Sequence, residues 1–364
     1  MQLWPWAVID QRLGDTMMGA TMKALLKVYI DRWTEATADL EVLSIEQTLW
    51  CPLYNLDTNR RSRNFVLSGK LDKVVRDNGK IVLYDHKTTG SKIDPESNYW
   101  RQLQVEGQPK QYEILLRANG FDVDRVVWDV VRKPQIRPKR LSRAAVSDIL
   151  ATSKYFAQDV SPYGLAALAD ATEGDKMVED YELFGFRVYD TIFRDPDEYL
   201  IRRTVPASNN ELYDHNQNMW DLSKDIVSAR RRDGGRQTYN AGACLQYGTP
   251  CRYLGICEGV DAPDSGNWRK GEVHPELDVE EIDCGGKEIL TNSRLKSFQT
   301  CQRKHHFRYE LGLEKHDSAD SDALFFGTVW HEVMDSWWTA ISGFQTEGGE
   351  SNGNRYTVAE GNLA

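Results

Sequence analysis

The segment from residue 65 to residue 88 constrains the fold of this chain more than any other part of it. Two strand-like apolar runs, FVLSGKLDKVV (65–75) and KIVLYDHKT (80–88), flank the turn sequence Asp77-Asn78-Gly79. Short apolar runs of alternating pattern around an Asn-Gly turn are typical of an antiparallel hairpin. The segment therefore predicts a hairpin that carries its polar residues at defined positions.

Those polar residues are unusual for a buried strand. The second run ends in Asp85, His86 and Lys87. Side chains alternate across a strand, so Asp85 and Lys87 point to one face and His86 to the other. Asp72 lies on the first strand of the hairpin, so the two carboxylates are expected a few ångströms apart.

The surrounding pattern predicts an α/β fold with a mixed central β-sheet flanked by helices. An amphipathic helix is expected first, and a further helix follows the hairpin and ends at Gly120. Residues up to about 232 are expected to be rich in helix, with one strand near EYLIRRTVP. The first helix is expected at 16–38, and further strands are expected at 40–50 and 123–133.

Four regions follow from composition. Residues 1–258 are expected to form the core, and 259–288, rich in Gly, Pro and Asp, a linker or surface excursion. Residues 289–342 are expected to form a second helical segment, and 343–364 a disordered tail.

Bulk composition narrows the class of protein. With 364 residues, 40% of them hydrophobic and 27% charged, the chain is long enough for a sizeable core. A net charge of −10 argues against a generally basic surface but leaves room for a local basic groove. No apolar run reaches membrane-spanning length and the start lacks the features of a secretory signal, so no membrane contact and a cytoplasmic location are expected.

Two carboxylates held close together repel each other unless a cation lies between them. Oxygen ligands of this kind favour Mg²⁺ or Mn²⁺, which keep open positions for water and phosphate. Lys87 would face the same place and could stabilise charge that develops during phosphodiester hydrolysis. The alternative is that Asp72, Asp85 and Lys87 are solvated charges on a hairpin.

Gln108 and Tyr112 lie four residues apart in the following helix, and hence on one face of it. Their amide and phenol groups could contact a phosphate or hold Lys87. Glu46, on the strand before the hairpin, is an acid of uncertain role that could equally be a charge at a strand edge.

The runs GKLDKVV, YDHKTTG and QPKQY together resemble the PD-(D/E)XK nuclease superfamily, in particular its RecB-like branch, which includes the AddB helicase–nuclease subunit and CRISPR-associated exonucleases. The resemblance implies that Asp72 and Asp85 bind a divalent metal and that Lys87 is catalytic. It also implies that Gln108 and Tyr112 form a supporting motif on the next helix.

The cysteines extend this resemblance. Cys244, Cys251 and Cys257 are spaced by six and five residues, wider than the tight pairs of most zinc sites. RecB-like nucleases with an iron–sulfur cluster have three such cysteines after the core and a remote fourth on a helix, which together bind a [4Fe–4S] centre. The resemblance implies that Cys301 is the fourth ligand, whereas four unrelated buried thiols are the alternative.

Gly327, Thr328 and His331 resemble the family's Gly-Thr-x-x-His motif, in which the imidazole is a further metal ligand. An isolated His on a Trp-rich helix is otherwise most often a core residue. Relatives place this helix and the cysteine helix before the strands, whereas here both follow the cysteine triplet. A circular permutation, a truncated second copy, or a half-site supplied by another subunit would each explain this order, and permutation needs the fewest assumptions.

The sequence therefore predicts a metal-dependent deoxyribonuclease, and specifically an exonuclease on single-stranded DNA or DNA ends. Asp72, Asp85 and His331 would bind Mg²⁺ or Mn²⁺. DNA recombination, repair, and phage or CRISPR-type processing are the expected settings, with a helicase or recombination partner. The competing hypotheses are a catalytically inactive iron–sulfur module that binds nucleic acid and a zinc-stabilised scaffold.

Overall fold

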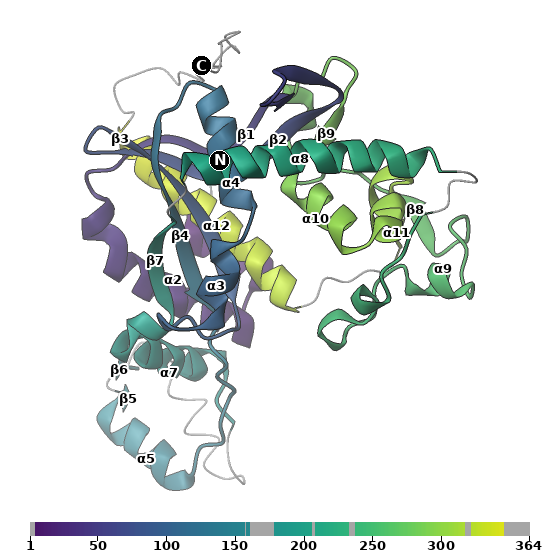
Figure 1. Cartoon of the computed structure of the whole chain (residues 1–364). Helices are drawn as coiled ribbons and strands as arrows, with labels where there is room; N and C mark the ends of the chain where they lie inside the picture. Colours follow the sequence, from purple (N-terminus) through teal and green to yellow (C-terminus); the bar gives the residue numbers. More distant parts are fainter. Residues whose placement is uncertain are drawn as a thin grey trace.

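A mixed β-sheet forms the centre of the molecule in the computed structural model, which describes residues 4–156, 158–160, 178–205, 208–232, 237–316 and 322–345 (Figure 1). Five strands follow the order β1-β2-β3-β4-β7, and β9 pairs with β2. The strands of this sheet are β1 Glu41–Asn55, β2 Arg60–Asp77, β3 Lys80–Thr89, β4 Val123–Arg132, β7 Leu200–Val205 and β9 Glu288–Leu290.

The pairing confirms the predicted mixed sheet. Strands β2 and β3 are antiparallel, β3 and β4 are parallel, and β4 and β7 are antiparallel again. The hairpin turn between β2 and β3 is present as expected, with Asn78 at φ 50° and Gly79 at φ 82°. Positive φ at both central residues matches the right-handed twist of the flanking strands.

Helices cover both faces of the sheet, so the core consists of two apolar layers. On one face, Leu83, Val126 and Trp128 pack against α4 and α8. On the other face, Val82 and Val127 pack against α1, α2, α7 and α12. The helices of these two layers are α1 Pro5–Leu13, α2 Met17–Thr37, α4 Gln108–Ala118, α7 Tyr181–Arg194, α8 Asn209–Arg230 and α12 Asp322–Gln345.

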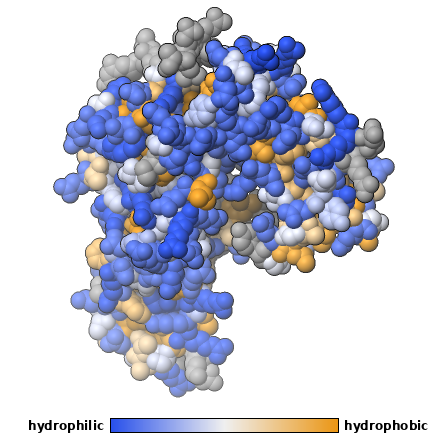
Figure 2. All heavy atoms as spheres, in the orientation of Figure 1, coloured by the Kyte–Doolittle hydropathy of each residue, from blue (hydrophilic) through white to orange (hydrophobic). Residues whose placement is uncertain are grey.

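Two smaller parts extend from this body. One carries α5 (Arg143–Thr152) and the short strands β5 (Lys154–Tyr155) and β6 (Gln158–Asp159), and it lies below the sheet in Figure 1. The other lies beside the sheet and carries the elements α9 Leu254–Glu258, β8 Trp268–Lys270, α10 Asn292–Thr300, α11 Gln302–His305 and β10 Leu313–Lys315. A short α3 (Asn98–Gln104) precedes α4. The surface is hollowed between the body and the part that carries α10 and α11 (Figure 2).

The segment 259–288, expected as a linker, contributes a strand and buried side chains. Its β8 pairs with β10, and Leu277 and Ile282 pack against Ile289 of β9. The predicted tail begins later than expected, because α12 continues to Gln345. Residues 346–364 lie outside the described part of the chain.

No helix in the described residues combines the length and apolar character that crossing a membrane requires.

Candidate active site

An interruption in the pairing of β2 creates the place where the predicted site residues meet. On one edge, Phe65–Leu67 pairs with β9, and pairing resumes with β3 only at Lys73. Within the described residues, no strand pairs with 68–72 on that edge, between the two ladders. Because the sheet is open there, groups from α4 on one face and α12 on the other can approach Asp72.

The α4 side of this opening carries Lys87 and its supports. Lys87 Nζ forms an ion pair with Asp85 and donates a hydrogen bond of 2.9 Å to Gln108 Oε1. Gln108 Nε2 in turn lies 2.7 Å from the hydroxyl oxygen of Tyr112. The expected alternation is confirmed, since Asp85 and Lys87 meet on one face. The helical spacing of Gln108 and Tyr112 therefore holds the ammonium group in place.

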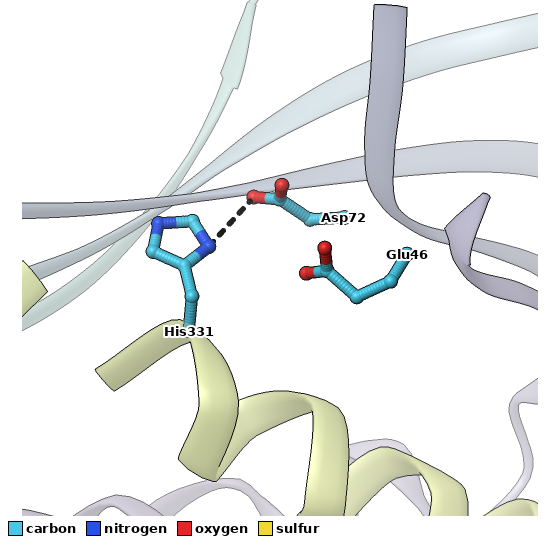
Figure 3. Close-up of side chains that lie close together, drawn as sticks. All are labelled: Glu46, Asp72 and His331. Atoms are coloured by element: carbon cyan, nitrogen blue, oxygen red, sulfur yellow. Dashed lines mark ion pairs between the residues drawn. The ribbon is translucent and has the colours of Figure 1, made fainter. Parts of the chain in front are cut away.

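The α12 side brings His331 to the same opening. Its Nδ1 lies 3.7 Å from Asp72 Oδ2, and Glu46 approaches from β1 (Figure 3). Ligand atoms of Glu46, Asp72 and His331 all lie within 4.8 Å of one another, and among the described residues only these three form such a group. Two carboxylates and an imidazole fit Mn²⁺ well and Mg²⁺ acceptably.

His86 contributes through its backbone, which sequence analysis missed. Its N–H donates a hydrogen bond of 2.6 Å to Asp72 Oδ2, and this bond orients the carboxylate. Its ring is buried on the opposite face from Lys87, where Nδ1 lies 3.6 Å from Asp129 Oδ2. His86 therefore contributes to the site through its backbone, although its ring lies on the opposite face of the strand.

Glu46 has a backbone conformation rare for its residue type. Its φ is 47°, between the pairs Ile45–Lys73 and Gln47–Leu71 of the β1–β2 ladder. A non-glycine residue in the left-handed region costs free energy, and such residues often occur at functional sites. The strand pattern gives no sign of this distortion, which explains why the sequence left the role of Glu46 open.

Burial dominates the electrostatics of the three acids. It raises the pKa of Glu46 to about 8, with the charge of Asp72 adding to the effect. Burial also raises the pKa of Asp85 to about 6, although Lys87 opposes it, and it raises the pKa of Asp72. A group of acids in this state gains from a divalent cation, which stabilises their charged forms.

The imidazole of His331 is neutral near pH 7, as a metal ligand must be. Burial, reinforced by the positive charge of Lys87, lowers its pKa to about 4. A neutral imidazole has a lone pair for a metal ion near neutral pH.

Asp85 stands apart from the ligand group. Its side chain is fully buried, it forms an ion pair with Lys87, and its oxygen atoms do not belong to the cluster of Glu46, Asp72 and His331. Its expected role as a metal ligand stays a prediction.

A groove of about 1010 Å³ gives solvent and ligands access to these groups. Its walls include Asp72, Lys87 and Gln108 from the sheet and α4, and Gly327, Thr328 and His331 from α12. Gly327 lets α12 lie close to β3, since a Cβ at this position would lie 3.0 Å from Thr88 Oγ1.

The four cysteines of the expected cluster come together in the part beside the sheet. The N–H of Cys251 donates a hydrogen bond of 2.7 Å to the carbonyl of Cys244. Cys251 and Cys301 lie close enough to Cys257 to raise its pKa, although burial is the main cause. Cys51 and Cys284 belong to other apolar clusters, as expected for unrelated thiols.

In the described residues, the cysteine sulfurs are spaced more widely than in a tetrahedral zinc site. Four sulfurs around a tetrahedral Zn²⁺ at a Zn–S distance of about 2.3 Å lie about 3.8 Å apart. No three of the cysteines in the described residues approach within 4.8 Å of one another. A cubane cluster binds each thiolate at a different corner iron, so it requires a wider spacing than zinc does.

Comparison with protein families matches residues 3–258 and 289–359 to the PD-(D/E)XK nuclease superfamily. Searches of curated proteins and of solved structures found no match. The match covers most of the chain and includes both the hairpin with Asp72, Asp85 and Lys87 and the helix with His331. The chain therefore belongs to the PD-(D/E)XK nuclease superfamily.

Proposed function

We propose that this protein is a metal-dependent deoxyribonuclease, and specifically an exonuclease that degrades single-stranded DNA or DNA ends. One observation carries the proposal. The side chains of Glu46, Asp72 and His331 form one group, and Lys87 lines the same groove. Two acids, an imidazole and a lysine in one groove suit hydrolysis of a phosphodiester.

Glu46, Asp72 and His331 would hold the divalent ion, and Asp85, which pairs with Lys87 outside their group, is proposed as a further ligand. When bound, Mg²⁺ or Mn²⁺ would supply positive charge at the scissile phosphate and activate water. The N–H of His86 orients Asp72. Lys87, held by Gln108 and Tyr112, would stabilise the negative charge that develops on the phosphate oxygens.

Cys244, Cys251, Cys257 and Cys301 are proposed to bind a [4Fe–4S] cluster. The support is that all four are half-buried free thiols in one region, with sulfur atoms farther apart than in a tetrahedral zinc site. Such a cluster suits a reducing cytoplasm and would be structural, since it would join the loop of the triplet to α10 and α11. As an exonuclease on single strands, the enzyme would act beside a helicase or recombination partner that supplies them.

The catalytic proposal is tested with labelled single-stranded DNA, Mn²⁺ and the Lys87→Ala variant. We expect the rate to fall by about 100-fold or more, because a preorganised charge is lost. Lys92→Ala, an exposed lysine that follows β3, is the matched control and should cleave normally. Equal loss in both variants, or cleavage that persists in excess EDTA, would contradict the proposal.

The finer assignments need two more measurements. A circular single strand should resist degradation if the enzyme is an exonuclease, whereas an endonuclease would cut it. Anaerobically purified protein should absorb visible light through iron–thiolate charge transfer, and Cys257→Ser should lose this band while Cys284→Ser keeps it. A colourless protein with stoichiometric zinc would argue against the cluster.

A further inference from the structure

We infer that a second groove, lined by basic residues beside the cysteine region, binds the phosphate backbone of the strand that is being cleaved. This inference rests on the proposed nuclease function and adds the path of the substrate outside the catalytic groove. The second groove, called the basic groove below, has a volume of about 480 Å³. Its lining is Gln246, Arg252, Tyr253, Ser293, Lys296, Ser297, Thr300, Lys304, Arg308 and Tyr309.

The charge of the basic groove is opposite to that of the chain as a whole. Four of its lining residues are cations, Arg252, Lys296, Lys304 and Arg308, and none is an acid. The chain as a whole carries a net charge of −10, so a groove lined by four cations and no acid differs from its average surface charge. Cations gathered in a concave surface focus the local field and attract a polyanion.

The cations are largely free to contact a ligand. In the described part of the chain, neither Arg252 nor Lys304 forms an ion pair, whereas Arg308 donates to the carbonyl of Glu272 and its charge acts on the nearby Glu276 carboxylate. Lys296 pairs with Glu106 at 3.0 Å but remains 61% exposed at its side chain. The ammonium group of Lys296 therefore faces solvent on one side, where a phosphate can contact it while its pair with Glu106, which is 15% exposed, persists.

The basic groove continues into the catalytic groove. Ser293, in the first turn of α10, lines both. At this junction the helix begins, and the partial positive charge of a helix start favours an anion. A strand that passes Lys87 and His331 can therefore extend over Ser293 into the basic groove.

The side chains of the basic groove suit phosphates better than bases. Tyr253 is buried and stacks on Trp268, and Tyr309 stacks on His305, so both aromatic rings of the groove are already engaged by the protein. Apart from the cations and the two tyrosines, the lining offers hydroxyls and an amide, contributed by Ser293, Ser297, Thr300 and Gln246. Contacts of this kind position a backbone without reading its sequence, so binding should be independent of sequence.

The cysteine region builds this groove from two sides. Arg252 directly follows Cys251, whereas Lys304 lies three residues after Cys301. Thr300, next to Cys301, also lines the groove. If the thiols hold the loop and α11 together, they also hold the basic groove in shape, which links the cysteines to substrate binding.

The test measures binding of a fluorescein-labelled 30-nucleotide single strand by anisotropy, in Ca²⁺ to suppress cleavage, with the full chain. The variant Arg252→Ala/Lys304→Ala should bind roughly 20-fold more weakly at 0.1 M salt, and its salt slope should fall by about 1.4, since two phosphate contacts are lost. Arg143→Ala/Lys154→Ala, on the part that carries α5, removes the same charge elsewhere and should bind normally.

Cleavage of a short substrate separates this inference from the nuclease proposal. A trinucleotide that fills only the catalytic groove should be cut at the same kcat by the wild type and by Arg252→Ala/Lys304→Ala in Mn²⁺. Equal binding of the 30-mer by both double variants would overturn the inference while leaving the nuclease proposal intact. If Arg252→Ala/Lys304→Ala weakened binding of a blunt duplex more than binding of the single strand, the inference would also be overturned, because the groove would then hold a duplex. A wild type that neither binds nor cleaves DNA would reject both.

Discussion

At the scale of single residues, the run Asp85-His86-Lys87 gives three neighbours three different environments. Asp85 and Lys87 form an ion pair on the α4 face, whereas the His86 ring is buried on the other face near Asp129. The N–H of His86 lies between these two and orients Asp72. The two-residue period of a strand predicts the first separation, but a backbone hydrogen bond to a side chain on another strand leaves no mark in a sequence.

Gly69 is a position where one methyl group should disturb catalysis. A Cβ there would lie 2.6 Å from Cε1 of Tyr112. Gly69→Ala should push the ring away, loosen Gln108 and Lys87, reduce kcat, and cost about 1–3 kcal/mol of stability. The measurements are single-strand cleavage rates and urea unfolding.

Gly266→Ala is the matched control for this substitution, since no atom lies within 4 Å of the added Cβ. It should leave both kcat and unfolding unchanged. A Gly69→Ala enzyme with normal kcat would show that Tyr112 does not position Lys87.

Metal binding should release a proton, because the pKa of Glu46 is raised to about 8 by burial. At pH 7 the metal-free carboxyl holds its proton and the ion must displace it, so Mn²⁺ affinity should rise about tenfold per pH unit up to pH 8. Calorimetry in buffers of different ionisation enthalpy should find about one proton released. Glu46→Gln should abolish that release, and an unchanged value would exclude Glu46 as a ligand.

The same shift has a consequence for stability without metal. A pKa of about 8, above the ordinary 4.5, means that protonated Glu46 favours the folded state. This contribution is complete below pH 4.5 and is lost as the pH rises through 8. Metal-free wild type should therefore lose stability between pH 6 and 8.5, and Glu46→Gln should lose less.

At the scale of elements, two features assemble the site: β2, which changes partner, and α12, which docks beside it. Strand β2 pairs with β9 and then with β3, and the residues between the two ladders include Asp72. Helix α12 brings His331 there because its apolar side chains join the core above β3 and β4. Neither element makes a site alone.

Trp330 anchors α12 and so should matter for metal binding. It is fully buried, with its ring 5.6 Å from that of Tyr29. Trp330→Ala should cost about 3–5 kcal/mol in urea unfolding and weaken Mn²⁺ binding, because the neighbouring His331 loses its position. Trp6→Ala, on the surface of α1, should leave Mn²⁺ affinity unchanged; if Trp330→Ala does so too, α12 does not carry a ligand.

At the scale of the whole molecule, the late helices and the early strands form one body. Helix α12 contacts α1 through the 3.0 Å ion pair of Glu332 with Arg12, and β9 extends the sheet of β2. The circular permutation expected from the order of the motifs would account for this arrangement, and it stays a prediction.

Rearranging the chain tests this prediction. A variant that starts at Gly286, continues to Gln345, and then joins Trp4 through a flexible linker should fold and cleave DNA, because the cut falls in an exposed turn before β9. Its melting temperature and activity should be close to those of the wild type. An unfolded product, while a variant with the same linker inserted at Gly266 folds, would contradict the prediction.

The sequence by itself determined the mixed sheet, the hairpin, the shared face of Asp85 and Lys87, and the spacing that joins Gln108 to Tyr112. These follow from periodicity and turn chemistry, which act between residues close in the chain. Only the tertiary structure decided that Glu46 joins Asp72 and His331, that Asp85 lies outside their group, and that a basic groove continues from the site. Those outcomes depend on the left-handed backbone at Glu46, the gap in β2 and the docking of α12, which are set by packing between distant segments.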